Sequence, residues 1–302
     1  MLEKGYDKRF VLGLIAAAGC IGVIIPPSIP MVIFCTSTGQ SITELFMAGF
    51  LPGILMGLGL MTVAYFISKK RGYSGDGRPF SFKRTLSAIW DGKWALISPV
   101  IILGGIYGSI FTPTEAAAVS VVYSFIVGVF IYKELRLRDI FGVIRSAGLT
   151  TGTVLVVLGC AAAFTKILTI GQIPQQIAGA ITRLTDNKLI ILLLLNIVLL
   201  FVGCFMDTAP SIMILAPILT PMLGAYGINP VSFGVIMVIT LGIGMLTPPV
   251  GINLYTAVSL CGEKVERVIN RHLFAYIGCA LVVLALLIGF EGIIMFLPNL
   301  LR

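Results

Sequence analysis

Two short segments of the sequence share a glycine that stands four residues before a pair of prolines. The first runs from Gly22 to Ser28 and the second from Gly244 to Val250, and each interrupts a long apolar stretch. Proline lacks an N–H group and clashes with the preceding helical turn, so two in a row unwind a helix and free backbone carbonyls. In hydrocarbon such carbonyls are costly unless protein, water or a cation satisfies them. Hard oxygen ligands of this kind suit Na⁺ better than soft metals.

A third polar segment, Gly203 to Ser211, separates two apolar stretches and contains Asp207. An acidic side chain inside a membrane is costly, and it is therefore a functional candidate. The alternative is that Asp207 caps the following helix by accepting hydrogen bonds from its first N–H groups. The two interpretations are compatible, and both stay open at this point. Thr208 and Ser211 add hydroxyl groups to the same segment.

These segments belong to a chain with the composition of a polytopic membrane protein. It has 302 residues, of which 58% are hydrophobic and 11% charged, and its mean hydropathy is +1.05. The net charge of +8 comes from 21 Lys and Arg against 13 Asp and Glu. At this low charge density it indicates membrane topology rather than nucleic-acid binding. The composition excludes soluble globular proteins, disordered chains, coiled coils and disulfide scaffolds, so we expect an all-α fold in a lipid bilayer.

The positions of the basic residues predict how the apolar stretches cross the membrane. Of the 21 basic residues, 17 fall in four clusters, within 4–9, 69–93, 133–145 and 264–271. The positive-inside rule places all four in the cytoplasm. All four clusters can lie on the cytoplasmic side only if 10–40 and 231–261 each cross the membrane once as broken helices and 188–224 forms a re-entrant hairpin. The other predicted spans are 46–68, 94–110, 114–132, 148–170 and 272–297.

The two broken helices then cross the membrane in opposite directions. A single Pro-Pro break is as well explained by a kink as by a site, but two matching breaks favour repeats that meet at a midplane site. Opposite directions make the repeats inverted, the arrangement used for alternating access. We expect the chain to have five parts. Residues 1–45 are the remainder of a first transport repeat, and 46–145 contain scaffold spans and cytoplasmic loops. Residues 146–187 form a connecting span and an interfacial helix at 173–185, 188–262 form a second transport repeat, and 263–302 form a C-terminal span.

Other chemically active residues indicate structural roles. Six Cys residues lie in apolar segments without a C-x-x-C pair, so we interpret them as small buried hydrophobic side chains. A lone His272 cannot supply the converging ligands of a haem or metal centre. Thr112 or Thr114 is expected to cap a helix that starts near Glu115. No constellation of base, nucleophile or cofactor ligands is present, so we predict neither an enzyme nor a bound cofactor.

Five stretches together resemble the large membrane subunit of TRAP transporters, the tripartite ATP-independent periplasmic family. They run along the chain in matching order: Gly5–Asp7, Gly22–Ser28, Phe111–Ala118, Phe205–Asp207 and Gly244–Gly251. The resemblance implies a multi-pass protein of the bacterial inner membrane that imports organic acids by Na⁺ symport with an elevator motion. It also implies two partners, a small membrane subunit and a periplasmic substrate-binding protein.

The resemblance also implies particular site residues. One Na⁺ site would lie between the hairpin tip and the second broken helix, with ligands from Gly203, Gly244, Thr247 and Val250. A second, incomplete cation site would include Gly22, Ile25 and Ser28. Asp207, with Thr208 and Ser211, would be the essential polar group near substrate or cation. No metal other than Na⁺ is expected.

Subunits of this kind carry further spans, including a first hairpin, before the Gly5–Asp7 motif. We therefore expect that the first broken helix lacks its partner hairpin within these residues, and that a chain limited to them does not transport. Two alternatives remain: a standalone Na⁺/dicarboxylate symporter of related architecture, and a truncated fragment that transports nothing. Dependence on a binding protein would separate the tripartite transporter from the standalone symporter.

Overall fold

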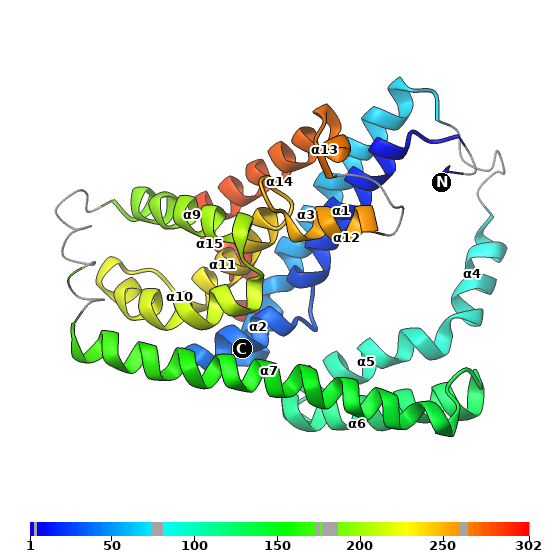
Figure 1. Cartoon of the computed structure of the whole chain (residues 1–302), viewed down its shortest axis with the longest axis horizontal. Helices are drawn as coiled ribbons and strands as arrows, with labels where there is room; N and C mark the ends of the chain where they lie inside the picture. The colour runs from blue at the N-terminus through cyan, green and yellow to red at the C-terminus, as the bar shows by residue number, and fades with distance from the viewer. Residues whose placement is uncertain (3–4, 74–80, 173–175, 177–186, 260–264, 302) are drawn as a thin grey trace. The chain divides into compact units, whose positions relative to one another are not determined.

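The computed structural model describes residues 1–2, 5–73, 81–172, 176, 187–259 and 265–301. Within these ranges every regular element is a helix (Figure 1). The chain divides into two compact units, one formed by Met1–Tyr73 and Cys160–Arg302, the other by Ser74–Gly159. Among the described residues, six helices are long and apolar enough to cross a membrane, or seven if a bent pair counts as one span. The predicted all-α, membrane-spanning class is therefore confirmed.

The first broken helix lies where the sequence predicts it. Helix α1 (Lys8–Ile24) stops before the prolines and α2 (Ile29–Thr38) follows them, with a cis peptide bond between Pro26 and Pro27. The buried Ser28 bridges the gap. Its hydroxyl donates to the Val23 carbonyl at 2.5 Å and accepts from the Met31 N–H at 3.4 Å, so it caps α2.

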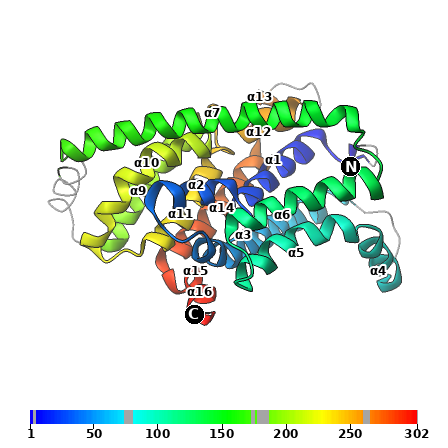
Figure 2. The same cartoon turned by 90° about the horizontal axis from the view of Figure 1, so that it is seen from below.

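The predicted hairpin consists of two helices joined by two residues. Helix α9 (Lys188–Phe205) ends at Met206, and Asp207 is the N-cap of α10 (Thr208–Leu223). Helix α10 packs against α2 of the first broken helix, and the two views show them side by side (Figures 1 and 2). A short 3₁₀ turn, Gly224–Tyr226, follows.

The second broken helix lies at the centre of the same unit. Helix α11 (Pro230–Gly244) is buried at every residue from Val231 onward, because α9, α1, α10 and α3 all pack against it. The break spans Met245–Gly251, again with a cis bond between two prolines, and α12 (Ile252–Ser259) follows. A helix that is apolar on all sides needs such complete enclosure.

Helices α3 (Ile42–Lys70) and α14 (Arg271–Gly289) complete this unit by packing against α1. The short helices α13 (Val265–Val268), α15 (Glu291–Ile294) and α16 (Phe296–Leu300) belong to it as well. The predicted last span, 272–297, is thus too long, because a non-helical backbone at Phe290 ends α14 and two separate short helices follow.

At one end of these helices, Asp7 connects α1 with α3. It caps α1 by accepting from the Arg9 N–H at 2.8 Å, and its other oxygen accepts from Arg71 at 2.5 Å. Arg71 also donates to His272 Nε2 at 2.6 Å, which brings in the start of α14. The hydrogen bond from Arg71 holds the pKa of the Asp7 carboxyl below its usual value. We name these three side chains the Asp7 cluster.

The other unit contains α4 (Phe82–Asp91), α5 (Lys93–Tyr107), α6 (Pro113–Ile126) with a π-helical end at Val127–Ile131, and most of α7 (Leu137–Ile170). The α4–α5 pair bends by 72°. The predicted cap is confirmed, because Thr112 and Glu115 form a capping box at the start of α6.

The helix that contains the predicted span 148–170 is longer than that span. Helix α7 starts at Leu137, and its exposed first turns carry Arg138, Asp139 and Arg145. Apolar run length therefore marked only the uncharged part of the helix. The predicted interfacial helix at 173–185 lies, apart from residue 176, outside the described residues.

Candidate cation site

The hairpin tip meets the second break through two glycines without side chains. A Cβ atom on Gly203 would lie 2.9 Å from the Leu241 carbonyl oxygen, and one on Gly244 would lie 2.6 Å from the Gly203 carbonyl carbon. The Gly251 N–H donates to the Cys204 carbonyl at 3.3 Å, which closes the contact from the far side of the break. Three separate backbone approaches thus bring the tip and the break together.

The last turn of α9 leaves backbone oxygens beside the break. A helix end has no internal partners for its last four carbonyls. Here the Val202 oxygen accepts from the Met206 N–H at 2.9 Å and the Cys204 oxygen accepts from Gly251. Among the described residues no hydrogen bond ends on the Gly203 or Val250 carbonyl. The lone pairs of both oxygens are therefore free to coordinate a cation.

Thr247 adds a hydroxyl group within the break. Its Oγ1 donates to the Ile243 carbonyl at 2.9 Å, so the proton points along the chain and the oxygen lone pairs stay available. The Thr247 N–H donates to the Gly244 carbonyl at 2.8 Å, which keeps one lone pair on that oxygen as well. The four residues expected to bind Na⁺ thus lie on the two segments that the structure brings into contact.

Asp207 lies at the tip, exposed within this chain, and acts as the cap of α10. Its Oδ1 accepts from the Thr208 N–H at 2.6 Å and from the Thr208 hydroxyl at 3.2 Å. The buried Ser211 hydroxyl donates to the Asp207 carbonyl at 2.7 Å. The capping interpretation is therefore confirmed, and the exposed carboxylate is accessible to a ligand.

The residues expected at the first break form a different environment. Gly22 has open space around it, with no heavy atom within 4 Å of an added methyl position, while Ile25 packs against Gly53. Ser28 uses its hydroxyl for capping. Val23 reaches the second broken helix, since its Cγ2 would lie 3.1 Å from a Cβ atom on Gly242.

Sequence reasoning missed a polar contact that joins α1 to both sides of the second break. The buried Cys20 thiol donates to the Gly242 carbonyl at 3.0 Å, and the Asn253 amide donates to Cys20 Sγ at 3.5 Å. Gly19 makes room, because a Cβ there would lie 3.2 Å from the Asn253 amide nitrogen. The sequence signal for this contact is an asparagine just after the break, between the apolar residues Ile252 and Leu254.

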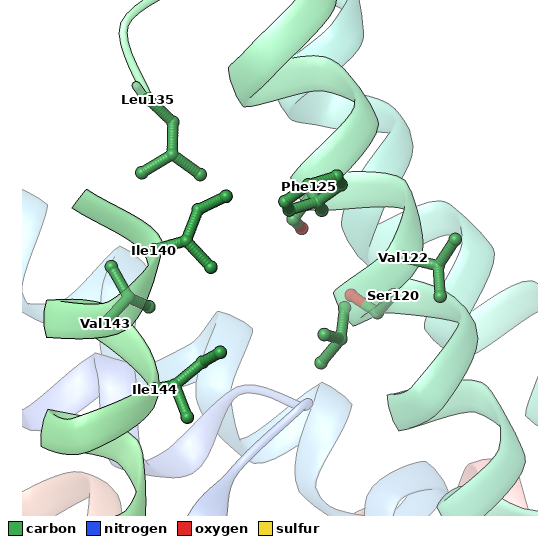
Figure 3. Close-up of a pocket in the computed structure, with 9 residues that line it drawn as sticks. Ser120, Val122, Phe125, Leu135, Ile140, Val143 and Ile144 are labelled. Carbon is green, nitrogen blue, oxygen red and sulfur yellow. The ribbon is translucent and has the colours of Figure 1, made fainter. Parts of the chain in front are cut away.

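A cleft in the other unit has the wrong chemistry for an ion. It measures about 560 Å³ and opens between α6 and the first turns of α7. Figure 3 shows Ile140, Val143 and Ile144 facing Phe125 across it. Of its two serines, Ser120 is already hydrogen-bonded to Ser98 at 3.2 Å. In the described residues no group of three or more His, Cys, Asp and Glu gathers as metal ligands either.

Comparison with known proteins identifies the family. The sequence model of the tripartite ATP-independent periplasmic transporter, DctM component, matches residues 1–293. The chain belongs to the DctM family. The resemblance stated from the sequence motifs is therefore confirmed, and the DctM match covers the hairpin and both breaks.

Three relatives of this DctM chain carry names that state a substrate. It is 44% identical to the isethionate TRAP transporter permease protein DctMQ of Oleidesulfovibrio alaskensis, over 98% of this chain and 46% of that protein. It is 39% identical to the C4-dicarboxylate large permease protein DctM of Pseudomonas aeruginosa, over 99% and 70%. It is 38% identical to the sialic acid large permease protein SiaM of Vibrio cholerae, also over 99% and 70%. The chain described here therefore spans about half the length of the Oleidesulfovibrio protein. All three are named as permeases, in agreement with the prediction that the chain is not an enzyme.

Proposed function

We propose that this chain is the transmembrane part of a Na⁺-coupled importer of small organic acids in the bacterial inner membrane. It would work with a small membrane subunit and receive substrate from a periplasmic binding protein, as a member of a tripartite periplasmic transporter family would. Na⁺ is the coupling ion, and no further cofactor is required.

The observation that carries this proposal is the meeting of Gly203 and Gly244. The approach is so close that neither position has room for a side chain. It supports the proposal because the Gly203 carbonyl, which accepts no hydrogen bond among the described residues, belongs to the segment that meets the break containing Thr247 and Val250. Carbonyl and hydroxyl oxygens at interrupted helices are the usual cation ligands of secondary transporters. We assign the coupling site to Gly203, Gly244, Thr247 and Val250.

The substrate class follows from the relatives and from the hairpin. Isethionate, C4-dicarboxylates and sialic acid, named in the relatives, are all anions of small organic acids. The start of α10 presents backbone N–H groups at the tip, and helix N-termini favour anions. Asp207 would then act through the cation or through a substrate hydroxyl, since its own charge repels the acid.

Alternating access in this proposal is an elevator motion of two inverted repeats. The two breaks and the hairpin pack against one another, since α10 contacts α2 and α11 contacts α9, α10 and α1, which supports a part that moves together. Helices α3 and α14 belong to the same compact unit, so the proposed boundary with the scaffold lies within that unit. Residues 1–45 and 188–262 would form the moving repeats. Residues 46–145 would form the scaffold. Residues 146–187 would connect the scaffold to the second repeat, and 263–302 would form the C-terminal span.

The test is uptake into proteoliposomes that contain a small membrane subunit, a binding protein and either these 302 residues or a version extended upstream by a first hairpin. Radiolabelled isethionate, succinate and sialic acid would be offered under an inward Na⁺ gradient, with a K⁺ gradient and a proton gradient as controls. We expect uptake of one acid by the extended version, under the Na⁺ gradient only and only with the binding protein present. Uptake without that protein would favour the standalone symporter. A response to protons alone would contradict Na⁺ coupling, and no uptake would favour the non-transporting fragment.

A further inference from the structure

A buried polar bond joins the hairpin to the second broken helix, away from the tip. Asn196 on α9 and Thr240 on α11 are 3% and 0% exposed. The Thr240 hydroxyl donates to Asn196 Oδ1, and it also lies 2.7 Å from the Ile236 carbonyl of its own helix. The Asn196 amide donates to the Leu192 carbonyl at 2.7 Å. The pair is thus satisfied on both helices.

Hydrophobic packing alone gives no reason for an asparagine at this position. Between Leu189 and Val202 the arm consists of Leu, Ile, Val and Phe apart from Asn196. A buried amide is costly without a partner, and its hydrogen bond contributes little net stability with one. Such a bond instead specifies which of many similar apolar packings the two helices adopt.

The position of the pair relative to the tip shows which packing it specifies. Asn196 and Gly203 are seven residues apart, so they lie on the same face of α9 two turns from each other. Thr240 and Gly244 are four residues apart and share a face of α11. The polar bond and the glycine contact therefore fix the same helix interface at two points. Rotating α9 by one residue would turn Gly203 by about 100° away from the break.

We propose that Asn196 and Thr240 are positioning residues of the cation site. Their hydrogen bond sets the rotation of α9 against α11 and so directs the Gly203 carbonyl toward Gly244 and Thr247. This inference rests on the proposed function, because it concerns the affinity of that site for Na⁺. It predicts that losing the bond weakens Na⁺ binding more than it weakens the fold.

The experiment measures the thermal unfolding of the purified chain in lipid nanodiscs. NaCl replaces choline chloride at constant ionic strength, and the Na⁺ concentration of half-maximal stabilisation is recorded. Thr240→Val keeps the side-chain shape and removes the hydroxyl. We expect it to raise that concentration about three- to tenfold, the loss of one buried hydrogen bond. Thr240→Ser retains the donor and should recover most of the affinity.

Thr62→Val is the matched control. The Thr62 hydroxyl donates to the Leu58 carbonyl at 2.7 Å on an exposed face of α3, with the same local geometry as Thr240 and Ile236. It should leave the Na⁺ midpoint unchanged. If Thr240→Val does not fold, Asn196→Leu removes the same bond from the other helix and should shift the midpoint in the same direction.

The outcomes separate this inference from the proposed function. A wild-type chain that Na⁺ does not stabilise beyond choline would overturn the cation site itself, and the positioning role with it. A wild-type chain that responds, beside a Thr240→Val chain with an unchanged midpoint, would overturn the positioning role alone. In that case the pair is a contact of the fold and nothing more.

Discussion

The direction of one proton makes Thr247 the most informative single residue of the site. Its hydroxyl donates to Ile243 at 2.9 Å, so a cation would meet the oxygen lone pairs rather than the hydrogen. Thr247→Val removes the oxygen at nearly constant volume. We predict that it raises the Na⁺ concentration for half-maximal thermal stabilisation about tenfold or more, because a charged ligand loses a direct partner.

Thr256→Val provides the control for Thr247. The Thr256 hydroxyl donates to the Ile252 carbonyl at 3.0 Å on the exposed side of α12, just beyond the same break. Both variants should unfold at similar temperatures in choline chloride, and only Thr247→Val should lose the Na⁺ response. Equal Na⁺ curves for the two variants would remove Thr247 from the ligand set.

Single residues were predictable where their chemistry acts locally. Asp207 could be interpreted as a cap because it precedes a helix by one residue, and the Thr112–Glu115 pair is likewise a local pattern. Cys20 and Asn253 could not be paired in this way. They are 233 residues apart, and no spacing rule connects residues on different helices at that separation. The interpretation of the cysteines as small buried side chains is confirmed for Cys20, Cys35 and Cys204 and wrong for Cys160, which is exposed, and it missed the hydrogen bond of Cys20.

At the scale of elements, the two breaks and the two-helix segment 188–224 were predictable because adjacent prolines and basic clusters are strong signals. Two adjacent prolines unwind a helix, whereas the separated Pro217 and Pro221 stay inside α10. The distribution of basic residues required 188–224 to enter and leave on one side of the membrane. The start of α7 and the helix α4 were not predicted. Both are exposed and charged, and an apolar-run criterion does not detect amphipathic turns of this kind.

The contact between α9 and α11 at the hairpin tip can be tested by replacing one of its glycines. A Cβ on Gly244 would lie 2.6 Å from the Gly203 carbonyl carbon, which belongs to the backbone and cannot rotate away. We predict that Gly244→Ala destabilises the chain by about 1–3 kcal/mol, the usual cost of overpacking. It should also abolish Na⁺-dependent stabilisation, because α9 must move away from α11.

Gly278→Ala is the comparison for that test. Gly278 lies within α14, and no heavy atom stands within 4 Å of the added methyl position. A helical Gly→Ala change of this kind is neutral or slightly stabilising. Thermal unfolding with and without Na⁺ checks both variants. If the Gly244→Ala and Gly278→Ala chains unfold at the same temperature and both are stabilised by Na⁺ as the wild type is, the close approach of Gly203 and Gly244 would be contradicted.

At the scale of the whole molecule, the charges give a consistent arrangement within the unit that holds both breaks. The Asp7 cluster joins the ends of α1 and α3 to the start of α14, and the sequence placed all three ends on the cytoplasmic side. Lys188, at the start of the hairpin, pairs with Glu291 beyond the far end of α14 at 2.5 Å. Basic clusters predict the side of each helix end, but which ends meet depends on packing that the sequence does not display.

The Asp7 cluster gives the pH dependence that this arrangement predicts. Arg71 lowers the pKa of Asp7 in the folded chain, so the ion pair stabilises the fold at every pH above the unfolded value of about 4. That contribution is lost as the pH falls through the lower, folded pKa. We predict that Asp7→Asn lowers the unfolding temperature by about 2 °C at pH 7, as expected for a partly exposed pair.

The deficit of Asp7→Asn relative to wild type should persist from pH 7 to pH 5, and any change there should be an increase, because Asp7 also favours the protonated form of His272. It should shrink only below about pH 4, where wild-type Asp7 also becomes protonated. Asp91→Asn is the control, because Asp91 is exposed at the end of α4 and its loss should change the unfolding temperature little at any of these pH values. A deficit that disappears between pH 7 and pH 5 would assign the effect to another group. No deficit at pH 7 would mean that the three helix ends are held together by packing without the ion pair.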